Sequence, residues 1–188
     1  MKKVLKAIGV LLLLIIAFFL IAGLFVKKDY HFEKSIVINA PKEIIWQNVS
    51  RFGNFEKWNP YASYDPDMKS NIEGTDGTVG AVYKWKGNKD VGSGSQTITR
   101  LEPMQRVEIQ LHFKTPFGEM KPEGYYTIQD DNTAQKVTWG FNSHSPYPFN
   151  ALNIFFNMDK MMDKDFTQGL NNLKQLCESG MPAAQQPE

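Results

Sequence analysis

The stretch Arg106-Val-Glu-Ile-Gln-Leu-His-Phe-Lys114 alternates apolar and polar side chains over its whole length. Ala81–Trp85 and Val137–Phe141 repeat this alternation. A period of two is typical of a β-strand with one buried and one solvated face. Turns that contain Gly, Pro or Asn separate such runs, so we expect six strands between about Asp67 and Asn142. Phe32–Asn39 adds a seventh strand, and the short connections predict an antiparallel meander.

Helical spacing appears on both sides of the strands. A helix is predicted from Pro41 to about Arg51, followed by a short helix around 55–58. A long C-terminal helix is predicted to begin near Phe149. Its apolar stripe, at steps of three or four, consists of Leu152, Phe155, Met158, Met162, Phe166, Leu170, Leu173 and Cys177. The stripe requires a broad apolar surface, which only the dry face of the sheet offers. These elements predict an α+β fold in which a curved seven-stranded antiparallel sheet surrounds the long helix.

The N-terminal segment is predicted to be a transmembrane helix. Ala7 to Val26 carries no charge, and at about 1.5 Å per residue it spans the roughly 30 Å hydrocarbon core. A cleaved signal peptide has a shorter apolar core and small residues before the cut. A cut after Ala22 would place Leu20 where a small residue is preferred. An uncleaved anchor at residues 7–26 is therefore favoured over cleavage. The excess of lysine before the segment favours a cytoplasmic N-terminus and an exported domain.

Basic and acidic residues are distributed unevenly on the two sides of the end of this segment. Of 21 basic residues, five flank the apolar run, and the other 16 oppose all 20 acidic residues. The chain from Asp29 onward therefore has a net charge of −4, which argues against a nucleic-acid-binding domain. About 160 residues remain to form one domain with a sizeable core. The single cysteine, Cys177, excludes an intrachain disulfide and a cysteine-rich metal site.

The order of the elements, together with several local strings, resembles the SRPBCC or START-like superfamily of helix-grip fold, and within it the polyketide cyclase/dehydrase and lipid transport group. The strings are Ile38-Asn-Ala-Pro-Lys-Glu-Ile-Ile-Trp46, Trp58-Asn-Pro60, Val79-Gly-Ala-Val-Tyr-Lys-Trp-Lys-Gly87, Val137-Thr-Trp139 and Lys164-Asp-Phe-Thr-Gln-Gly-Leu-Asn-Asn-Leu-Lys174. On this basis we divide the chain into an anchor (1–28), a START-like domain (29–178) and a disordered tail (179–188).

The resemblance implies an apolar cavity between the sheet and the long helix. Strand parity directs one set of side chains into that space, and the helix supplies the others. The predicted lining residues are Tyr83, Trp85, Leu111, Phe113, Tyr126, Trp139, Phe141, Phe156, Met162 and Phe166. Met158 and Met161 are expected to extend an adaptable wall around Met162. For any single residue, ordinary core packing is the simpler interpretation, and the fold favours a cavity for the group as a whole.

Groups suited to catalysis are scarce on the predicted inner face. His31 adjoins the membrane, His112 falls on the wet face of its strand and pairs there with Glu108, and His144 lies in the loop before the helix. No spaced set of His, Cys and carboxylate ligands predicts a metal, and no cofactor is expected. The Thr115–Gly118 turn, with Phe117 and nearby Met120, is expected at the cavity entrance.

Three functions remain open at this point. The favoured hypothesis is a membrane-anchored domain that binds or transfers a hydrophobic small molecule or lipid without covalent chemistry. The resemblance also allows an enzyme of the polyketide cyclase, aromatase or dehydratase kind, in which an inward polar residue such as Tyr83 or Tyr126 would act. The third hypothesis is an interaction module whose apolar groove binds a partner segment in an envelope complex.

Overall fold

A computed structural model describes residues 1–115 and 118–179. Its order is α1 (Lys2–Phe25), β1 (Asp29–Ile38), α2 (Lys42–Ser50), α3 (Phe52–Trp58), η1 (Pro60–Ser63), β2 (Lys69–Glu73), β3 (Val82–Lys86), β4 (Ser93–Glu102), β5 (Arg106–Thr115), β6 (Gly118–Met120), β7 (Glu123–Asp131), β8 (Ala134–His144), η2 (Phe149–Phe155) and α4 (Met158–Ser179). Here η denotes a 3-10 helix. The tail predicted to be disordered lies outside the described residues, apart from Ser179, which belongs to α4.

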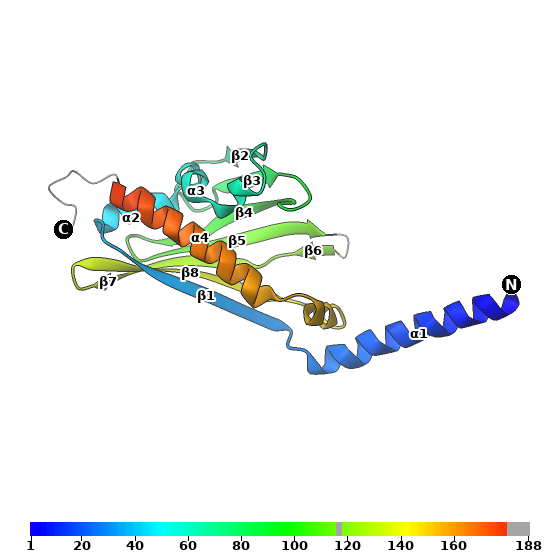
Figure 1. Ribbon diagram of the computed structural model, residues 1–188. Helices are drawn as coiled ribbons and strands as arrows, with labels where there is room; N and C mark the ends of the chain where they lie inside the picture. Colours follow the sequence, from blue (N-terminus) through cyan, green and yellow to red (C-terminus); the bar gives the residue numbers. More distant parts are fainter. Residues whose placement is uncertain (116–117, 180–188) are drawn as a thin grey trace.

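The strands form one antiparallel sheet in the order β1-β8-β7-β5-β4-β3-β2. These are the seven strands expected from the alternation, and the short β6 is an additional strand that pairs with β5. α4 lies across one face of the sheet, and α2 and α3 lie beside its C-terminal half (Figure 1). The α+β helix-grip architecture is therefore confirmed.

The core occupies the space between the sheet and α4. Its most deeply buried members include Ile38, Ile45, Trp58, Phe166 and Leu170. They come from the first strand, the two short helices and α4, because each of these elements presents one apolar face to the sheet. Cys177, at the last turns of α4, is fully buried in the same core.

The predicted start of the long helix is wrong. α4 begins at Met158, and residues Phe149–Phe155 form the separate 3-10 helix η2. The side chain of Asn157 accepts a hydrogen bond of 3.0 Å from the Lys160 backbone N–H, so Asn157 acts as a cap at the start of α4. The apolar period continues through both segments, which explains why the spacing alone predicts one helix.

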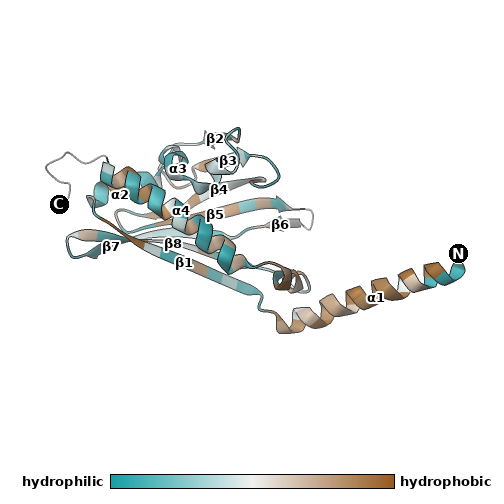
Figure 2. Ribbon diagram, viewed as in Figure 1, coloured by the Kyte–Doolittle hydropathy of each residue, from teal (hydrophilic) through white to brown (hydrophobic). Residues whose placement is uncertain are grey.

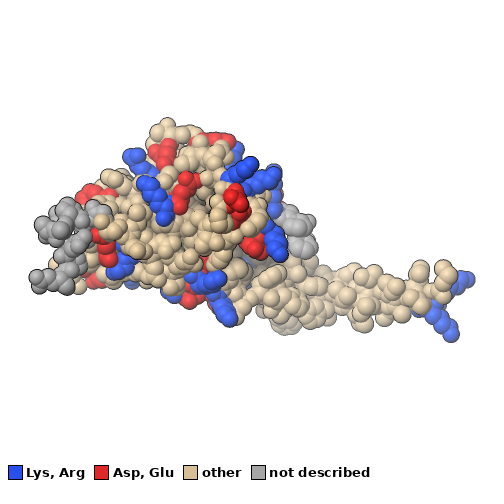
Figure 3. Space-filling view, turned by 45° about the horizontal axis from the view of Figure 1, so that its top comes forward, with Lys and Arg blue, Asp and Glu red and all other residues tan. Residues whose placement is uncertain are grey.

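α1 projects from the end of the sheet at which β1 begins (Figure 1). It is long and apolar enough, by length and composition, to cross a membrane. Figure 2 shows its apolar colouring, and Figure 3 shows basic groups at its free end with no charge along the rod. Its last turns contact η2 and Tyr147, which precedes η2.

Candidate ligand cavity

A cavity of about 150 Å³ lies between the sheet and α4. Strands β3, β4, β5, β7 and β8 form its floor, and α3, η1 and α4 contribute its other walls. Its surface is almost entirely apolar and rich in aromatic rings. The lining residues are Phe55, Asn59, Tyr61, Met68, Tyr83, Trp85, Val91, Gln96, Ile109, Leu111, Phe113, Gly124, Tyr126, Trp139, Phe141, Met162 and Phe166.

The structure brings together every lining residue predicted from the sequence except Phe156. Strand alternation gives the reason. In β5, Leu111 and Phe113 point toward α4, whereas His112 points to the opposite face. The register between adjacent strands also places lining residues next to each other. For example, Tyr126 of β7 pairs with Trp139 of β8.

Phe156 is the exception, and the prediction for it is wrong. Its side chain is 62% exposed and lines a separate hollow outside the cavity. Phe156 has an extended backbone, with φ of −115° and ψ of 122°, in the link between η2 and α4. It therefore never joins the inner face of the helix. Met158 also lines the outer hollow and Met161 is exposed, so of the three clustered methionines only Met162 lines the cavity.

Aromatic contacts set the shape of the cavity. Trp139 stacks on Phe166 with ring centroids 4.1 Å apart, which fixes the distance between sheet and helix. Trp58 of α3 packs edge-on against Trp139 at 5.4 Å and so helps to hold that ring in place. Along the sheet, Trp85 lies 5.5 Å from Phe113. The walls are thus large rings whose positions depend on one another.

Gln96 is the lining residue that the sequence analysis missed and that matters most for chemistry. It lies on β4 between Tyr83 of β3 and Leu111 of β5 and is only 5% exposed. A buried amide therefore lies in the wall of an apolar cavity, where it can donate and accept hydrogen bonds. Gln96 lies two positions before buried Ile98 on the same strand, so the two side chains share a face. This spacing was the signal in the sequence that could have identified Gln96 as an inward residue.

The titratable groups on the described cavity lining are tyrosine hydroxyls. Burial raises the pKa of Tyr83 to about 12. Burial likewise raises the pKa of Tyr126 above its ordinary value. Both side chains therefore stay neutral near pH 7. The nearest buried carboxylate, Asp165 on α4, accepts a 2.7 Å hydrogen bond from the Tyr64 hydroxyl.

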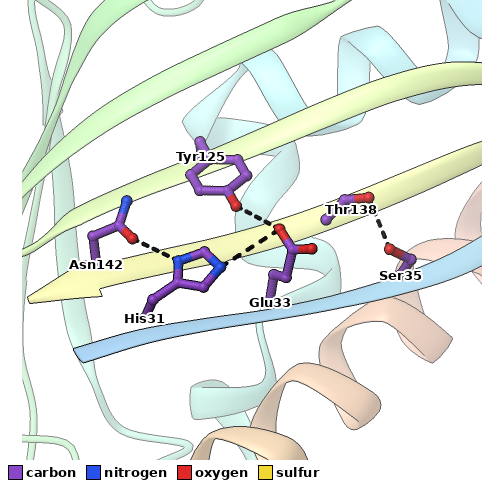
Figure 4. A network of polar contacts seen from close by, with 6 residues as sticks. All are labelled: His31, Glu33, Ser35, Tyr125, Thr138 and Asn142. Carbon is purple, nitrogen blue, oxygen red and sulfur yellow. Dashed lines mark hydrogen bonds and ion pairs between the residues drawn. The ribbon is translucent and has the colours of Figure 1, made fainter.

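Polar side chains cluster on the opposite face of the sheet (Figure 4). His31 Nδ1 lies 2.7 Å from Asn142 Oδ1, and the Tyr125 hydroxyl donates to Glu33 at 2.7 Å. This face is solvated and separate from the cavity. The figure therefore shows a surface network that ties β1, β7 and β8 together.

The histidine placements are partly confirmed. His112 lies on the outer face, but its partner is Glu119 at 3.0 Å; the predicted partner Glu108 instead pairs with Arg106 at 2.7 Å. His144 ends β8, where its ring lies 2.6 Å from Asp29. Among the described residues no cluster of three or more His, Cys, Asp or Glu could hold a metal ion. Phe117 lies outside the described residues, and nearby Met120 lines the outer hollow.

A second, wider hollow of about 890 Å³ opens beside η2. Tyr30 of β1 and the side chains of η2 line it. The Tyr30 ring lies 6.5 Å from that of Phe141, which lines the inner cavity. One layer of aromatic side chains therefore separates the hollow from the cavity at this point.

Comparison with solved structures supports the fold. Norcoclaurine synthase from Thalictrum flavum, in complex with dopamine and hydroxybenzaldehyde, superposes with a TM-score of 0.62 at 11% identity, covering 82% of this chain and 89% of the other. The Aha1 dimer from Colwellia psychrerythraea gives 0.59 at 19% identity, covering 81% and 99%. The ginseng major latex-like protein 151 from Panax ginseng gives 0.56 at 12% identity, covering 80% and 99%.

Sequence comparison supplies the family. No curated protein matches the chain. The family profile described as "Polyketide cyclase / dehydrase and lipid transport" matches residues 29–178, the part of the chain that forms the sheet and α4. With this match over most of its length, and with an apolar cavity in the helix-grip fold, the chain belongs to the polyketide cyclase / dehydrase and lipid transport family.

Proposed function

We propose that the chain is a membrane-anchored domain that binds or transfers a hydrophobic small molecule or lipid in the cavity between the sheet and α4. The observation that carries the proposal is the aromatic, almost wholly apolar lining with two buried amides, Asn59 and Gln96. Such a lining is typical of ligand sites in which a few polar groups orient an apolar ligand. α1 supports the anchoring because it is long and apolar enough to span a bilayer.

The domain limits and the topology belong to this proposal. The anchor comprises residues 1–28 and the binding domain residues 29–178. The lysines that precede α1 favour a cytoplasmic N-terminus, with the domain on the exported side. Protease treatment of intact cells tests this orientation. Degradation of the domain from outside is expected, and full protection of the domain would reverse the assignment.

The size of the cavity restricts the ligand. At about 150 Å³ it matches a cavity of roughly 150 Å³ that holds a benzene ring, and it lies below the roughly 300–1,000 Å³ of sites for larger ligands. The described conformation thus has room for one ring or a short aliphatic segment. A complete lipid requires α4 or the adjoining loops to move outward. We therefore expect binding of lipid chains to be coupled to opening of the cavity.

An enzymatic function of the cyclase or dehydratase kind would depend on the inward tyrosines. Their raised pKa values suit them to donate hydrogen bonds and make them poor bases near pH 7. The cavity lining in the described residues carries no carboxylate, histidine or lysine. These features support binding of a ligand better than acid–base chemistry on it.

Native mass spectrometry of the full chain in mild detergent, followed by extraction and identification of the released ligand, tests the binding proposal. Leu111→Trp fills part of the cavity, and Val79→Trp adds the same bulk at a surface site that is 59% exposed. We expect a co-purified apolar ligand in the native chain and in Val79→Trp, with several-fold less in Leu111→Trp. Met162→Phe repeats the test from the helix side. An empty native chain that takes up nothing from a lipid mixture would contradict the proposal.

A further inference from the structure

The C-terminal end of α1 is held by side chains from the η2 region. The fully buried Asn150 donates from Nδ2 to the backbone oxygens of Gly23 at 2.8 Å and Val26 at 2.7 Å. The Tyr147 hydroxyl donates to the Leu20 oxygen at 3.2 Å. Carbonyls at the end of a helix lack intrahelical partners, and Asn150 supplies a partner for the Gly23 carbonyl of α1. Gly23 permits this approach, since a Cβ there would lie 3.1 Å from the Tyr147 ring.

The contact between α1 and η2 extends well before the end of the apolar run. The Phe155 ring lies 6.1 Å from Phe19 and 6.5 Å from Phe18. Phe19 precedes Val26 by seven residues, which is about 10 Å along a helix axis. In the proposed function, on which this inference rests, α1 spans the bilayer and Val26 lies near the edge of the hydrocarbon. Phe155 then lies at the depth of Phe19, inside the membrane.

The segment that would lie in the membrane is uncharged and exposes several large apolar side chains. Phe149–Phe156 contains no charged residue, and Phe149, Ile154, Phe155 and Phe156 are all exposed. Figure 2 shows this segment in the apolar colours of the neighbouring α1. Clustered exposed apolar side chains mark an interaction surface. Continuity with α1 identifies the partner as the hydrocarbon of the bilayer, because elements that lie in the membrane interface bury about 5–10 Å into it.

We propose that Phe149–Phe156 inserts into the bilayer leaflet on the side of the domain, as a second membrane element held rigidly beside α1. Insertion buries the exposed aromatic side chains in lipid and turns the hollow beside η2 toward the acyl chains. Tyr30, in that hollow, is one aromatic layer from Phe141 of the cavity. The domain is therefore oriented on the membrane with its lipid-facing hollow next to the binding cavity.

Site-directed spin labelling tests the insertion. The full chain is reconstituted in vesicles of phosphatidylcholine and phosphatidylglycerol, with a nitroxide at Phe155→Cys and, in a second variant, at Phe156→Cys. Ile15→Cys reports on the middle of α1. Val79→Cys reports on the β2–β3 connection at the other edge of the sheet from β1. Cys177 is buried, and burial raises the pKa of its thiol to about 11, so background labelling of the unsubstituted chain should be low.

We expect collisions with oxygen to exceed collisions with a water-soluble nickel chelate several-fold at Phe155, Phe156 and Ile15, and the reverse at Val79. Nickel accessibility at both phenylalanine sites equal to that at Val79, with Ile15 in lipid, would overturn the insertion and leave the anchor standing. Water-like accessibility at Ile15 would instead overturn the membrane span itself and the insertion with it.

Discussion

Trp139 and Phe166 stack face to face, with ring centroids 4.1 Å apart and planes inclined by 12°. The pair joins the middle of β8 to the middle of α4. Gly169, one helical turn after Phe166, makes room for the indole, because a Cβ there would lie 2.6 Å from Trp139. This contact sets the height of the cavity and also contributes to the stability of the domain.

Phe166→Ala is expected to lower the free energy of unfolding by about 3–5 kcal/mol, since a buried ring is lost and the cavity beside it grows. Denaturation of the full chain in detergent, followed by tryptophan fluorescence, measures the loss. Met161→Ala, at an exposed position of the same helix, is the matched control and should cost about 0.5 kcal/mol or less. A loss below about 1 kcal/mol for Phe166→Ala would show that the stack does not hold the helix to the sheet.

A second close approach lies on the outer face of the sheet. Gly140 leaves space for the Tyr125 ring, which a Cβ would approach to 2.0 Å. Gly140→Ala should displace the ring and cost about 1–3 kcal/mol, because Tyr125 would lose its bond to Glu33 and its contact with Arg106. In the background of Tyr125→Ala the same substitution should cost nothing or stabilise the strand. Equal costs in both backgrounds, measured by denaturation, would exclude the steric explanation.

The inward face of the sheet could be predicted from the sequence because strand parity is a local property. A correct period and a neighbouring helix were enough to predict that four of these side chains face inward, namely Leu111, Phe113, Trp139 and Phe141. The start of α4 was also within reach, since Asn157 is a helix-capping residue type placed before an apolar stripe. The prediction failed there because Leu152 and Phe155 continue the same spacing. Their apolar side chains serve the α1 contact and the outer hollow instead of the core.

Other features depend on contacts that no local pattern records. Asn150 and Gly23 are 127 positions apart, and neither residue type in isolation indicates that a domain side chain bonds to the end of α1. The cavity volume depends on ring contacts between different elements, such as Trp58 with Trp139 and Trp85 with Phe113. Gln96 is an intermediate case. The alternation along β4 predicts that its side chain faces inward, but the sequence does not show that its amide lies in the wall of a cavity.

The buried amide of Gln96 predicts selectivity among small ligands. Benzene and phenol both suit a cavity of about 150 Å³, and only phenol can hydrogen-bond to the amide. Gln96→Leu should therefore weaken phenol binding by about 2–12-fold, the equivalent of about 0.5–1.5 kcal/mol, and should leave benzene binding unchanged or stronger. Titration of the full chain followed by NMR provides both affinities. Equal weakening for the two ligands would mean that Gln96 shapes the cavity without recognising the ligand.

The raised pKa of Tyr83 predicts a loss of stability at alkaline pH. The unfolded chain loses this proton near pH 10, whereas the folded chain keeps it until about pH 12. Between these values the unfolded state binds fewer protons, so stability falls with rising pH, by up to about 1.4 kcal/mol per pH unit for this residue. Tyr83→Phe should make the slope shallower by that amount. An unchanged slope in urea denaturation series from pH 10 to 12 would contradict the assignment.

The hydrogen bonds at the end of α1 predict that Asn150 controls how firmly α1 is joined to the domain. Asn150→Leu keeps the size of the side chain but removes its bonds to the oxygens of Gly23 and Val26. At about 1 kcal/mol each, their loss should increase opening of the Lys27–Asp29 link by about 30-fold. Trypsin cleavage after Lys27 and Lys28 in reconstituted vesicles measures this opening. Asn153→Leu makes the same change in η2 without affecting those bonds and should cleave at the native rate. Equal rates for all three chains would show that the Asn150 bonds do not hold the Lys27–Asp29 link closed, whatever the depth of η2 in the bilayer.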